Sequence, residues 1–173
     1  MASFLLFLLG TLTVAGSQAG LVKFGRMVQQ ATKRPALWSF SFYGCYCGLG
    51  GQGWPMDDID WCCQKHDCCY DVLMKAGCAP LSQDYNYSHI NGVITCDDED
   101  LNGCARVCCE CDREISHCFR ENNHRYRKEH NLNFSRKKCW GKPLPCLGGP
   151  PPRSHTTYTN TGDGEPDQSK GSY

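Results

Sequence analysis

The sequence predicts a mainly α-helical, disulfide-rich fold with an N-terminal helix, a glycine-rich loop, two long antiparallel disulfide-linked helices and a small β-hairpin. Three observations support this fold class. The chain has fifteen cysteines in 173 residues, apolar residues recur at helical spacing in three segments, and one Asn-Gly pair separates two short β-prone runs.

All fifteen cysteines lie between Cys45 and Cys146. Cysteines at this density in an exported chain indicate a disulfide scaffold, because an oxidising compartment lets bridges form and persist. A zinc protein is the alternative, but adjacent pairs such as Cys62-Cys63 do not suit tetrahedral ligand spacing. The count is odd, so one thiol stays reduced or pairs outside the intramolecular set.

Residues 1–19 predict a cleaved signal peptide. An apolar run over residues 5–14 is too short to span a membrane, and Ser17 and Ala19 place small residues where a signal peptidase cuts. We therefore expect a secreted, extracellular protein.

The remaining chain divides into two parts. Residues 20–146 hold every cysteine and predict one folded domain, whereas residues 147–173 are a Pro/Gly-rich polar tail that we expect to be disordered. Lys and Arg (18) balance Asp and Glu (18), which excludes a nucleic-acid partner bound through net charge. Two basic clusters, at 125–128 and 136–138, fit a solvated surface better than a binding patch.

The first expected element is an amphipathic helix over residues 21–31. Five glycines within residues 43–53 predict a loop, because glycine permits backbone angles and close approaches that other residues do not. A second helix should begin near Pro55, where proline and three aspartates suit a first turn, and end at about Lys75 before the stop residue Gly77.

A β-hairpin is expected around Asn91-Gly92, which is flanked by aromatic and β-branched residues. A third helix should follow over residues 102–125. Its inner face should carry six residues, namely Cys104, Val107, Cys108, Cys111, Ile115 and Cys118.

Cysteine spacing places the two long helices against each other. Cys62 and Cys69 are seven residues apart, as are Cys111 and Cys118, so each pair lies on one helix face two turns apart. If Cys62 pairs with Cys118 and Cys69 with Cys111, the two residue numbers in each pair add up to the same value. Equal sums of this kind require that the two helices are antiparallel and in register. Other pairings stay open at this point.

The same register would bring Asp112 beside His66 and suggests a general base. A carboxylate fixes the tautomer of a histidine and keeps it basic enough to take a proton near neutral pH. No serine or cysteine is placed as a nucleophile, so the base should activate water directly. A structural histidine is the alternative; the adjacent Asp67 and the preceding glycine-rich loop favour catalysis.

The glycine-rich loop and Asp67 together suggest a calcium site. The loop can turn backbone carbonyls inward, and calcium prefers oxygen ligands in flexible number. Such an ion would polarise a substrate carbonyl as a Lewis acid, and a loop N–H would complete the oxyanion site.

Two long motifs carry a resemblance to a known family. The first is Tyr43-Gly-Cys-Tyr-Cys-Gly-Leu-Gly-Gly-Gln-Gly, followed by Asp57, Asp60 and Cys62-Cys-Gln-Lys-His-Asp-Cys-Cys-Tyr70, and the second is Cys109-Glu-Cys-Asp112. The chain resembles secreted phospholipase A2 over about residues 20–146. Adjacent Cys68 and Cys69 and the extension to Cys146 are similar to the group II type, and the proline-rich tail is similar to its long-tailed members.

The resemblance implies the phospholipase A2 fold and hydrolysis of the sn-2 ester of a glycerophospholipid to a fatty acid and a lysophospholipid, with Ca²⁺ as cofactor. It makes His66 the general base and Asp112 the residue that orients it. It implies further roles: calcium ligation by the carbonyls of Tyr46, Gly48 and Gly50 and the carboxylate of Asp67, an oxyanion N–H from Gly48, hydrogen bonds to the aspartate from Tyr70 and Tyr85, and an acyl channel lined by Leu21, Phe24 and Val28.

The family's bridge pattern, carried onto this sequence, agrees with the equal-sum pairing. It implies Cys45–Cys139, Cys47–Cys63, Cys62–Cys118, Cys68–Cys146, Cys69–Cys111, Cys78–Cys104 and Cys96–Cys109. Cys108 is the thiol outside this pattern, and we expect it to be buried as a small hydrophobe. The alternatives are that it replaces Cys109 as the partner of Cys96 or forms an intermolecular bridge.

The expected partner is a phospholipid membrane surface, contacted through apolar residues such as Leu21, Leu49 and Trp54 rather than through charge. Sequons at Asn86 and Asn133 suggest N-glycosylation. The alternative function is a binding protein on the same scaffold, either a ligand of a cell-surface receptor, a toxin-like partner or a mineral-matrix protein of the otoconin kind. The intact His66 and Asp67 favour the enzyme.

Overall fold

The computed structural model of the 173-residue chain describes residues 19–97, 103–131 and 139–146. Most of the expected signal peptide, the tail over 147–173 and the sequon at Asn133 lie outside these residues. Among the described helices, none is both long enough and apolar enough to cross a membrane.

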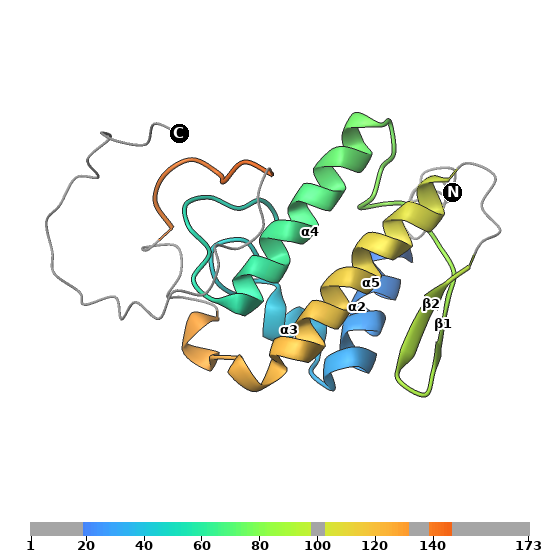
Figure 1. The fold of residues 1–173 in the computed structure, drawn as a ribbon, viewed down its shortest axis with the longest axis horizontal. Coiled ribbons are helices and arrows are strands. Elements are labelled where there is room, and N and C mark those ends of the chain that lie inside the picture. Colours follow the sequence, from blue (N-terminus) through green and yellow to red (C-terminus); the bar gives the residue numbers. More distant parts are fainter. Residues whose placement is uncertain (1–18, 98–102, 132–138, 147–173) are drawn as a thin grey trace, which may run out of the picture.

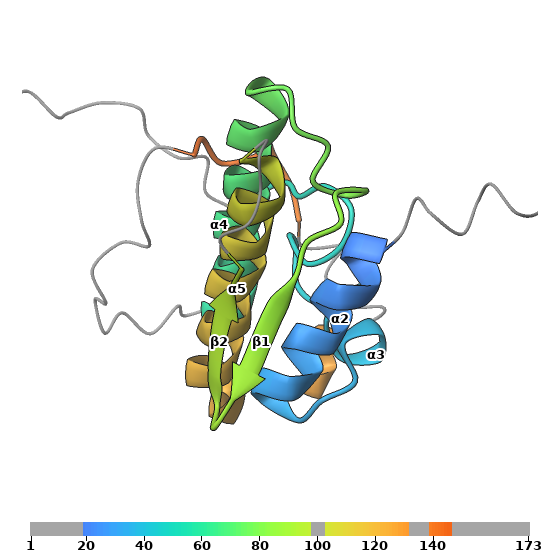
Figure 2. The ribbon, with the colours of Figure 1, turned by 90° about the vertical axis from the view of Figure 1, so that its right-hand side faces the viewer.

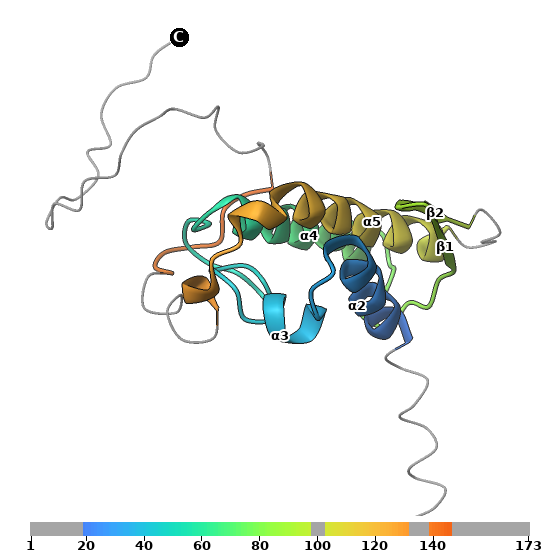
Figure 3. The same ribbon diagram turned by 90° about the horizontal axis from the view of Figure 1, so that it is seen from below.

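Two long helices lie side by side and form one layer of the molecule (Figure 1). They are α4, Asp58–Lys75, and α5, Cys104–Asn122. The helices α2, Ala19–Thr32, and α3, Ala36–Phe40, lie together on one side of this pair (Figure 3). The hairpin of β1, Tyr87–Ile90, and β2, Val93–Cys96, lies beside α5 (Figure 2).

Seven disulfides cross-link these elements, and they are the seven pairs that the resemblance implied. Two of them, Cys62–Cys118 and Cys69–Cys111, join α4 to α5 with Cα–Cα distances of 5.8 and 5.9 Å. Because the early residue of α4 pairs with the late residue of α5, the helices are antiparallel, as the equal position sums required. The fold class predicted from the sequence is therefore confirmed. The other pairs are Cys45–Cys139, Cys47–Cys63, Cys68–Cys146, Cys78–Cys104 and Cys96–Cys109.

The start of α4 and the hairpin follow from local sequence. Asp57 caps α4, because its side chain accepts a hydrogen bond from the Asp60 N–H at 3.0 Å. Pro55 was expected in the first turn of this helix, but it lies two residues before the cap. In the hairpin, Asn91 and Gly92 have φ of 50° and 81°, the left-handed pair that a two-residue turn requires, and Ile90 pairs with Val93.

One helix was missed from the sequence, and one residue was assigned to the wrong face. The helix α3 was not predicted, because five residues are too few to show a helical period; it forms because Phe40 turns inward and stacks on Phe119 at 4.2 Å. Val107 was assigned to the inner face of α5 but is 38% exposed. The inner face carries Asp112, Ser116 and Phe119 in addition to the cysteines and Ile115.

The end of α5 also differs from the prediction. The α-helix stops at Asn122, and Asn123–Arg125 continues as a 3₁₀ turn, followed by a second one at Lys128–His130. An isolated bridge between Tyr43 and Asn131 then brings this segment back to the glycine-rich loop.

Candidate active site

His66 and Asp112 meet at the interface between α4 and α5. The Nε2 atom of His66 lies 2.7 Å from Asp112 Oδ1, and the two side chains are 9% and 1% exposed. The carboxylate accepts two further hydrogen bonds, so we assign the Nε2 proton to the histidine and leave Nδ1 as the basic nitrogen. The predicted pair is therefore brought together with a defined tautomer.

Two tyrosine hydroxyls complete the surroundings of Asp112. Tyr70 donates to Oδ1 at 2.7 Å and Tyr85 donates to Oδ2 at 2.5 Å. Burial, and then the Asp112 charge, raise the pKa of both tyrosines far above the ordinary value. Both hydroxyls therefore remain protonated donors at any working pH, and they hold the carboxylate in one orientation for His66.

The imidazole of His66 is also fixed by ring packing. Phe24 of α2 stacks on it with centroids 5.0 Å apart and planes 14° apart, and Tyr70 lies against it at 4.1 Å. Phe24 thus lies against the His66 ring, and its role in an acyl channel stays a prediction. Leu21 is 41% exposed, whereas Val28 is 1% exposed and packs in the core.

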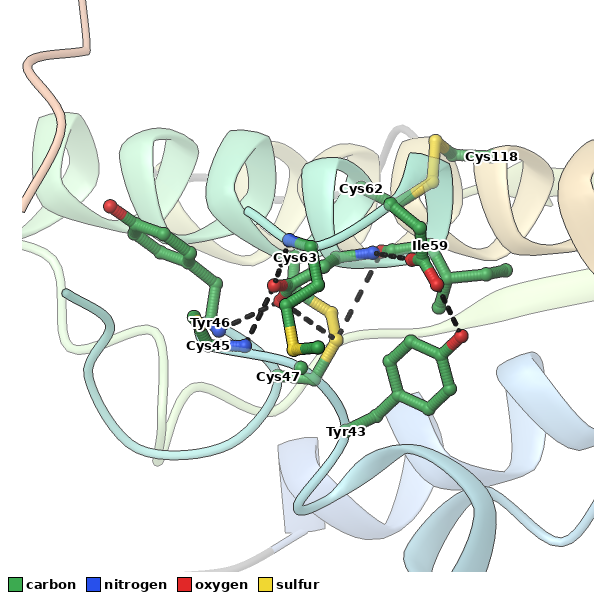
Figure 4. Close-up of a disulfide and its surroundings, with 12 residues drawn as sticks. Tyr43, Cys45, Tyr46, Cys47, Ile59, Cys62, Cys63 and Cys118 are labelled. Atoms are coloured by element: carbon green, nitrogen blue, oxygen red, sulfur yellow. Dashed lines mark hydrogen bonds between the residues drawn. A yellow bond between two sulfur atoms is a disulfide. The ribbon is translucent and has the colours of Figure 1, made fainter. Parts of the chain in front are cut away.

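The glycine-rich loop runs beside the start of α4 and is fixed to it by Asp60. This fully buried carboxylate accepts hydrogen bonds from the N–H groups of Cys45 at 2.7 Å and Tyr46 at 2.8 Å, and from Met56 at 2.8 Å. Figure 4 shows Cys45 and Tyr46 with their nitrogens toward this helix. Burial raises the pKa of Asp60, and the three N–H donors oppose that shift.

Asp60 was predicted only as part of a helix start and a family motif, so its organising role was missed. The signal that could have revealed it is Gly44, whose φ is 60° and whose added Cβ would collide with the Asp60 carboxyl group. Gly48 has φ of 131°, and a Cβ there would collide with the Ser41 carbonyl. Both positions therefore demand glycine.

The segment 139–146 also holds the glycine-rich loop in place. The Tyr46 hydroxyl donates to the Gly53 carbonyl at 2.7 Å and accepts from the Leu144 N–H at 2.9 Å. Gly53 N–H in turn donates to the Lys142 carbonyl at 3.2 Å. Because Cys139 is bonded to Cys45, the segment 139–146 is tied across the loop at several points.

Asp67 has the chemistry of a cation ligand. It follows His66 on α4 and is partly buried, yet within the described part of the chain no group donates a hydrogen bond to its carboxylate. Burial raises the pKa of Asp67 to about 7, and the charge of Asp60 adds to this shift. A bound cation would stabilise the ionised form and remove that penalty.

The donor set around Asp67 suits a hard cation. Within the described residues, no group of three or more His, Cys, Asp or Glu side chains is placed to hold a metal. A cation beside Asp67 would therefore depend on backbone carbonyls of the glycine-rich loop, a pure oxygen set of the kind that calcium prefers. The residues present fit calcium.

Comparison with known proteins assigns the family. A family model described as phospholipase A2 matches residues 21–131. The chain belongs to the phospholipase A2 family. It is 45% identical to a phospholipase A2 of Pithecopus azureus over 144 residues, covering 83% of this chain and 98% of that protein.

Secretory mammalian members of the phospholipase family are similarly close. The chain is 43% identical to the group IID secretory phospholipase A2 of Mus musculus over 77% of this chain and 91% of that protein. It is 42% identical to the group IIE enzyme of the same organism over 73% and 86%. The predictions of a secreted, group II-like phospholipase A2 hydrolase are thereby confirmed. Secretory members of this family typically use calcium.

Proposed function

We propose that this phospholipase hydrolyses the sn-2 ester of glycerophospholipids in a calcium-dependent reaction. The observation that carries the proposal is the His66–Asp112 pair, held by two tyrosines, with Asp67 adjacent to the base. A histidine can activate water as a general base when a carboxylate binds one ring nitrogen and the other ring nitrogen is left to take the proton. The geometry of His66 supports this role.

In the proposed reaction His66 Nδ1 takes a proton from water as the oxygen attacks the ester carbonyl carbon. Asp112 stabilises the imidazolium that forms, because its Oδ1 lies 2.7 Å from Nε2. The C–O bond to the glycerol then breaks, and the proton passes from His66 to the departing oxygen. The products are a fatty acid and a lysophospholipid.

Calcium would be held by the carbonyls of Tyr46, Gly48 and Gly50 and by the carboxylate of Asp67. When bound, it supplies a positive charge that polarises the ester carbonyl and stabilises the oxyanion. The N–H of Gly48 would donate to the same oxyanion. Asp60 supports this site indirectly, because it fixes the N–H groups of Cys45 and Tyr46 and hence the loop that carries the carbonyls.

The proposed surface for membrane contact is apolar. Leu21, Leu49 and Trp54 are 41%, 88% and 57% exposed, and the net charge of the chain is zero. Apolar and aromatic side chains enter the interfacial region of a bilayer without help from charge. We therefore expect hydrolysis of zwitterionic vesicles to tolerate salt; a steep loss of binding as salt rises would point to the basic clusters instead.

Asn86 is a proposed glycosylation site. Its side chain is exposed, and its Oδ1 accepts a hydrogen bond from Lys23 Nζ at 3.1 Å. A glycan attaches to the other terminal atom, Nδ2, so the contact with Lys23 is compatible with modification.

The test is hydrolysis of mixed-chain phosphatidylcholine vesicles, first with calcium and then with a chelator. We expect release of the sn-2 acyl chain only with calcium. His66→Gln should abolish turnover while calcium binding persists, and Asp67→Lys should abolish both. Absence of calcium-dependent release from the wild-type chain would overturn the proposal and favour a binding protein, such as a receptor ligand, on this scaffold.

A further inference from the structure

Lys23 is fixed by three acceptors on one short segment. Its Nζ lies 2.7 Å from the Tyr85 carbonyl, 2.7 Å from Asp84 Oδ1 and 3.1 Å from Asn86 Oδ1. Two of these contacts are hydrogen bonds from the ammonium, to the Tyr85 carbonyl and to Asn86 Oδ1, and the third is an ion pair with Asp84. The Lys23 side chain is 27% exposed, so its charge is better shielded from water than that of an ordinary surface lysine.

The segment 84–86 is held by α2 and by other parts of the molecule, because the Asn86 carbonyl accepts from the Asp97 N–H at 3.1 Å and the Tyr85 side chain is buried in the core. It precedes β1 and lies outside any helix or strand, although the Tyr85 N–H donates to Asp84 Oδ1 at 3.0 Å. The helix α2 approaches it closely at a second point, because a Cβ on Gly20 would collide with the Gln83 carbonyl. Contacts with α2 therefore add to the restraints that position the Tyr85 backbone.

Tyr85 connects this segment to the proposed catalytic pair. Its hydroxyl donates to Asp112 Oδ2 at 2.5 Å, while His66 and Tyr70 share Oδ1. One residue after Lys23, Phe24 stacks on the His66 ring. A continuous path of contacts thus runs from Lys23 through Tyr85 to the carboxylate that orients the base.

We propose that Lys23 is a positioning residue, which clamps the backbone of Tyr85 to α2 and thereby holds Asp112 in register with His66. This inference rests on the proposed function for its effect on turnover, but the clamp itself can be measured without substrate. Without Lys23 the Tyr85 backbone can shift, and the hydroxyl no longer reaches Oδ2 in one fixed geometry. The carboxylate then orients the imidazole less well, which affects the chemical step more than substrate binding.

The first experiment compares Lys23→Met with Lys75→Met. Lys75 forms an exposed ion pair with Asp71 at 2.6 Å, so its variant removes a lysine–aspartate contact of similar length away from the site. Both variants are made with Ser88→Ala, which keeps a glycan off Asn86. On monomeric short-chain phosphatidylcholine with calcium, Lys23→Met should lower kcat about two- to threefold with KM little changed, and Lys75→Met should change neither.

The second experiment asks whether Lys23 acts through Tyr85. In a Tyr85→Phe background, Lys23→Met should lower kcat by less than about 1.5-fold, because the bond that the clamp serves has already been removed. An equal loss of kcat in both backgrounds, or a change confined to KM, would overturn the positioning role.

Denaturant unfolding supplies a readout that needs no turnover. The unfolding equilibrium constants of the wild type, both single variants and the double variant should show a coupling of about fivefold between Lys23 and Tyr85. If the two substitutions changed the unfolding free energy independently, the proposed contact between Lys23 and the Tyr85 backbone would be overturned, even in a fully active enzyme. If the wild type fails to hydrolyse phospholipid, the proposed function fails, whereas the clamp is still decided by this unfolding cycle.

Discussion

The described part of the chain contains two histidine–aspartate pairs with the same nitrogen–oxygen distance. His66 Nε2 lies 2.7 Å from Asp112, and His130 Nδ1 lies 2.7 Å from Asp57. In each pair a tyrosine hydroxyl also donates to the carboxylate; Tyr43 does so for Asp57 at 2.6 Å. Distance alone therefore does not distinguish a catalytic pair from a structural one.

The difference lies in what else each carboxylate does. Among the described residues, the side chains that bind the two oxygens of Asp112 are His66, Tyr70 and Tyr85. The second oxygen of Asp57 accepts a hydrogen bond from the backbone N–H of Asp60, so Asp57 caps α4. The His66 pair also has Asp67 beside it, a carboxylate that lacks protein donors among the described residues. An active site is thus defined by its neighbours more than by the pair itself.

The largest expected effect separates the two histidines. His66→Gln should lower kcat by about 10³-fold or more, because a positioned general base contributes a factor of that order. His130→Gln should leave kcat within about twofold, and its cost should appear in denaturant unfolding as about 1 kcal/mol from a lost hydrogen bond. Turnover on vesicles and unfolding curves of both variants provide the measurements. A large loss of turnover in His130→Gln would remove the distinction between the pairs.

The next effect concerns Asp67 in the calcium-free protein. Its folded pKa of about 7 lies above the ordinary value of 3.8, so the folded state holds the proton more tightly than the unfolded state. This carboxyl group therefore costs stability as pH rises from about 4 to about 7, and the cost stays constant above that range. The shift corresponds to roughly 4 kcal/mol as an upper limit.

Asp67→Asn should consequently stabilise the calcium-free protein by about 2 kcal/mol at pH 8, because the uncharged amide avoids most of that cost. The gain should vanish near pH 4. Unfolding curves with a chelator at both pH values would show it, and calcium should stabilise only the wild type. Equal stability of the two proteins at pH 8 would mean that the ionised Asp67 carboxylate does not destabilise the calcium-free protein.

An effect of similar size on stability is expected at the structural pair. Asp57→Ala removes the cap of α4 and the acceptor of both Tyr43 and His130, and should cost about 2 kcal/mol of unfolding free energy. Asp57→Asn retains a capping oxygen and should recover about half of this. Calcium-dependent turnover at low temperature should persist in both. If turnover fell while the fold remained intact, the Asp57 pair would belong to the active site.

Much of the site could be predicted because cysteine positions encode helix register. Equal position sums for Cys62–Cys118 and Cys69–Cys111 required antiparallel helices, and this register brought Asp112 to His66. The glycines of the loop likewise indicated close backbone approaches. The register of two regular helices follows from the number of residues between their cysteines, so it can be calculated from the sequence.

The parts that escaped prediction depend on three-dimensional packing. The five residues of α3 are too few for a period, and their helix depends on Phe40 reaching Phe119 in the core. The inward position of Asp60 depends on a loop fifteen residues earlier that supplies its donors. Lys23 reads as an ordinary polar residue of an amphipathic helix, because its acceptors lie more than sixty residues later in the chain.

The smallest effect compares the tyrosines of the two pairs. Tyr43→Phe and Tyr85→Phe each remove one hydroxyl that donates to the carboxylate of its pair, so each should cost about 1 kcal/mol of stability. Only Tyr85→Phe should also lower kcat, by about threefold, because only Asp112 orients a base. Short-chain phosphatidylcholine assays and unfolding curves on the same preparations measure both quantities. Equal kcat in the two variants would mean that Tyr70 alone is enough to orient Asp112, and the path from Lys23 through Tyr85 would then serve stability rather than turnover.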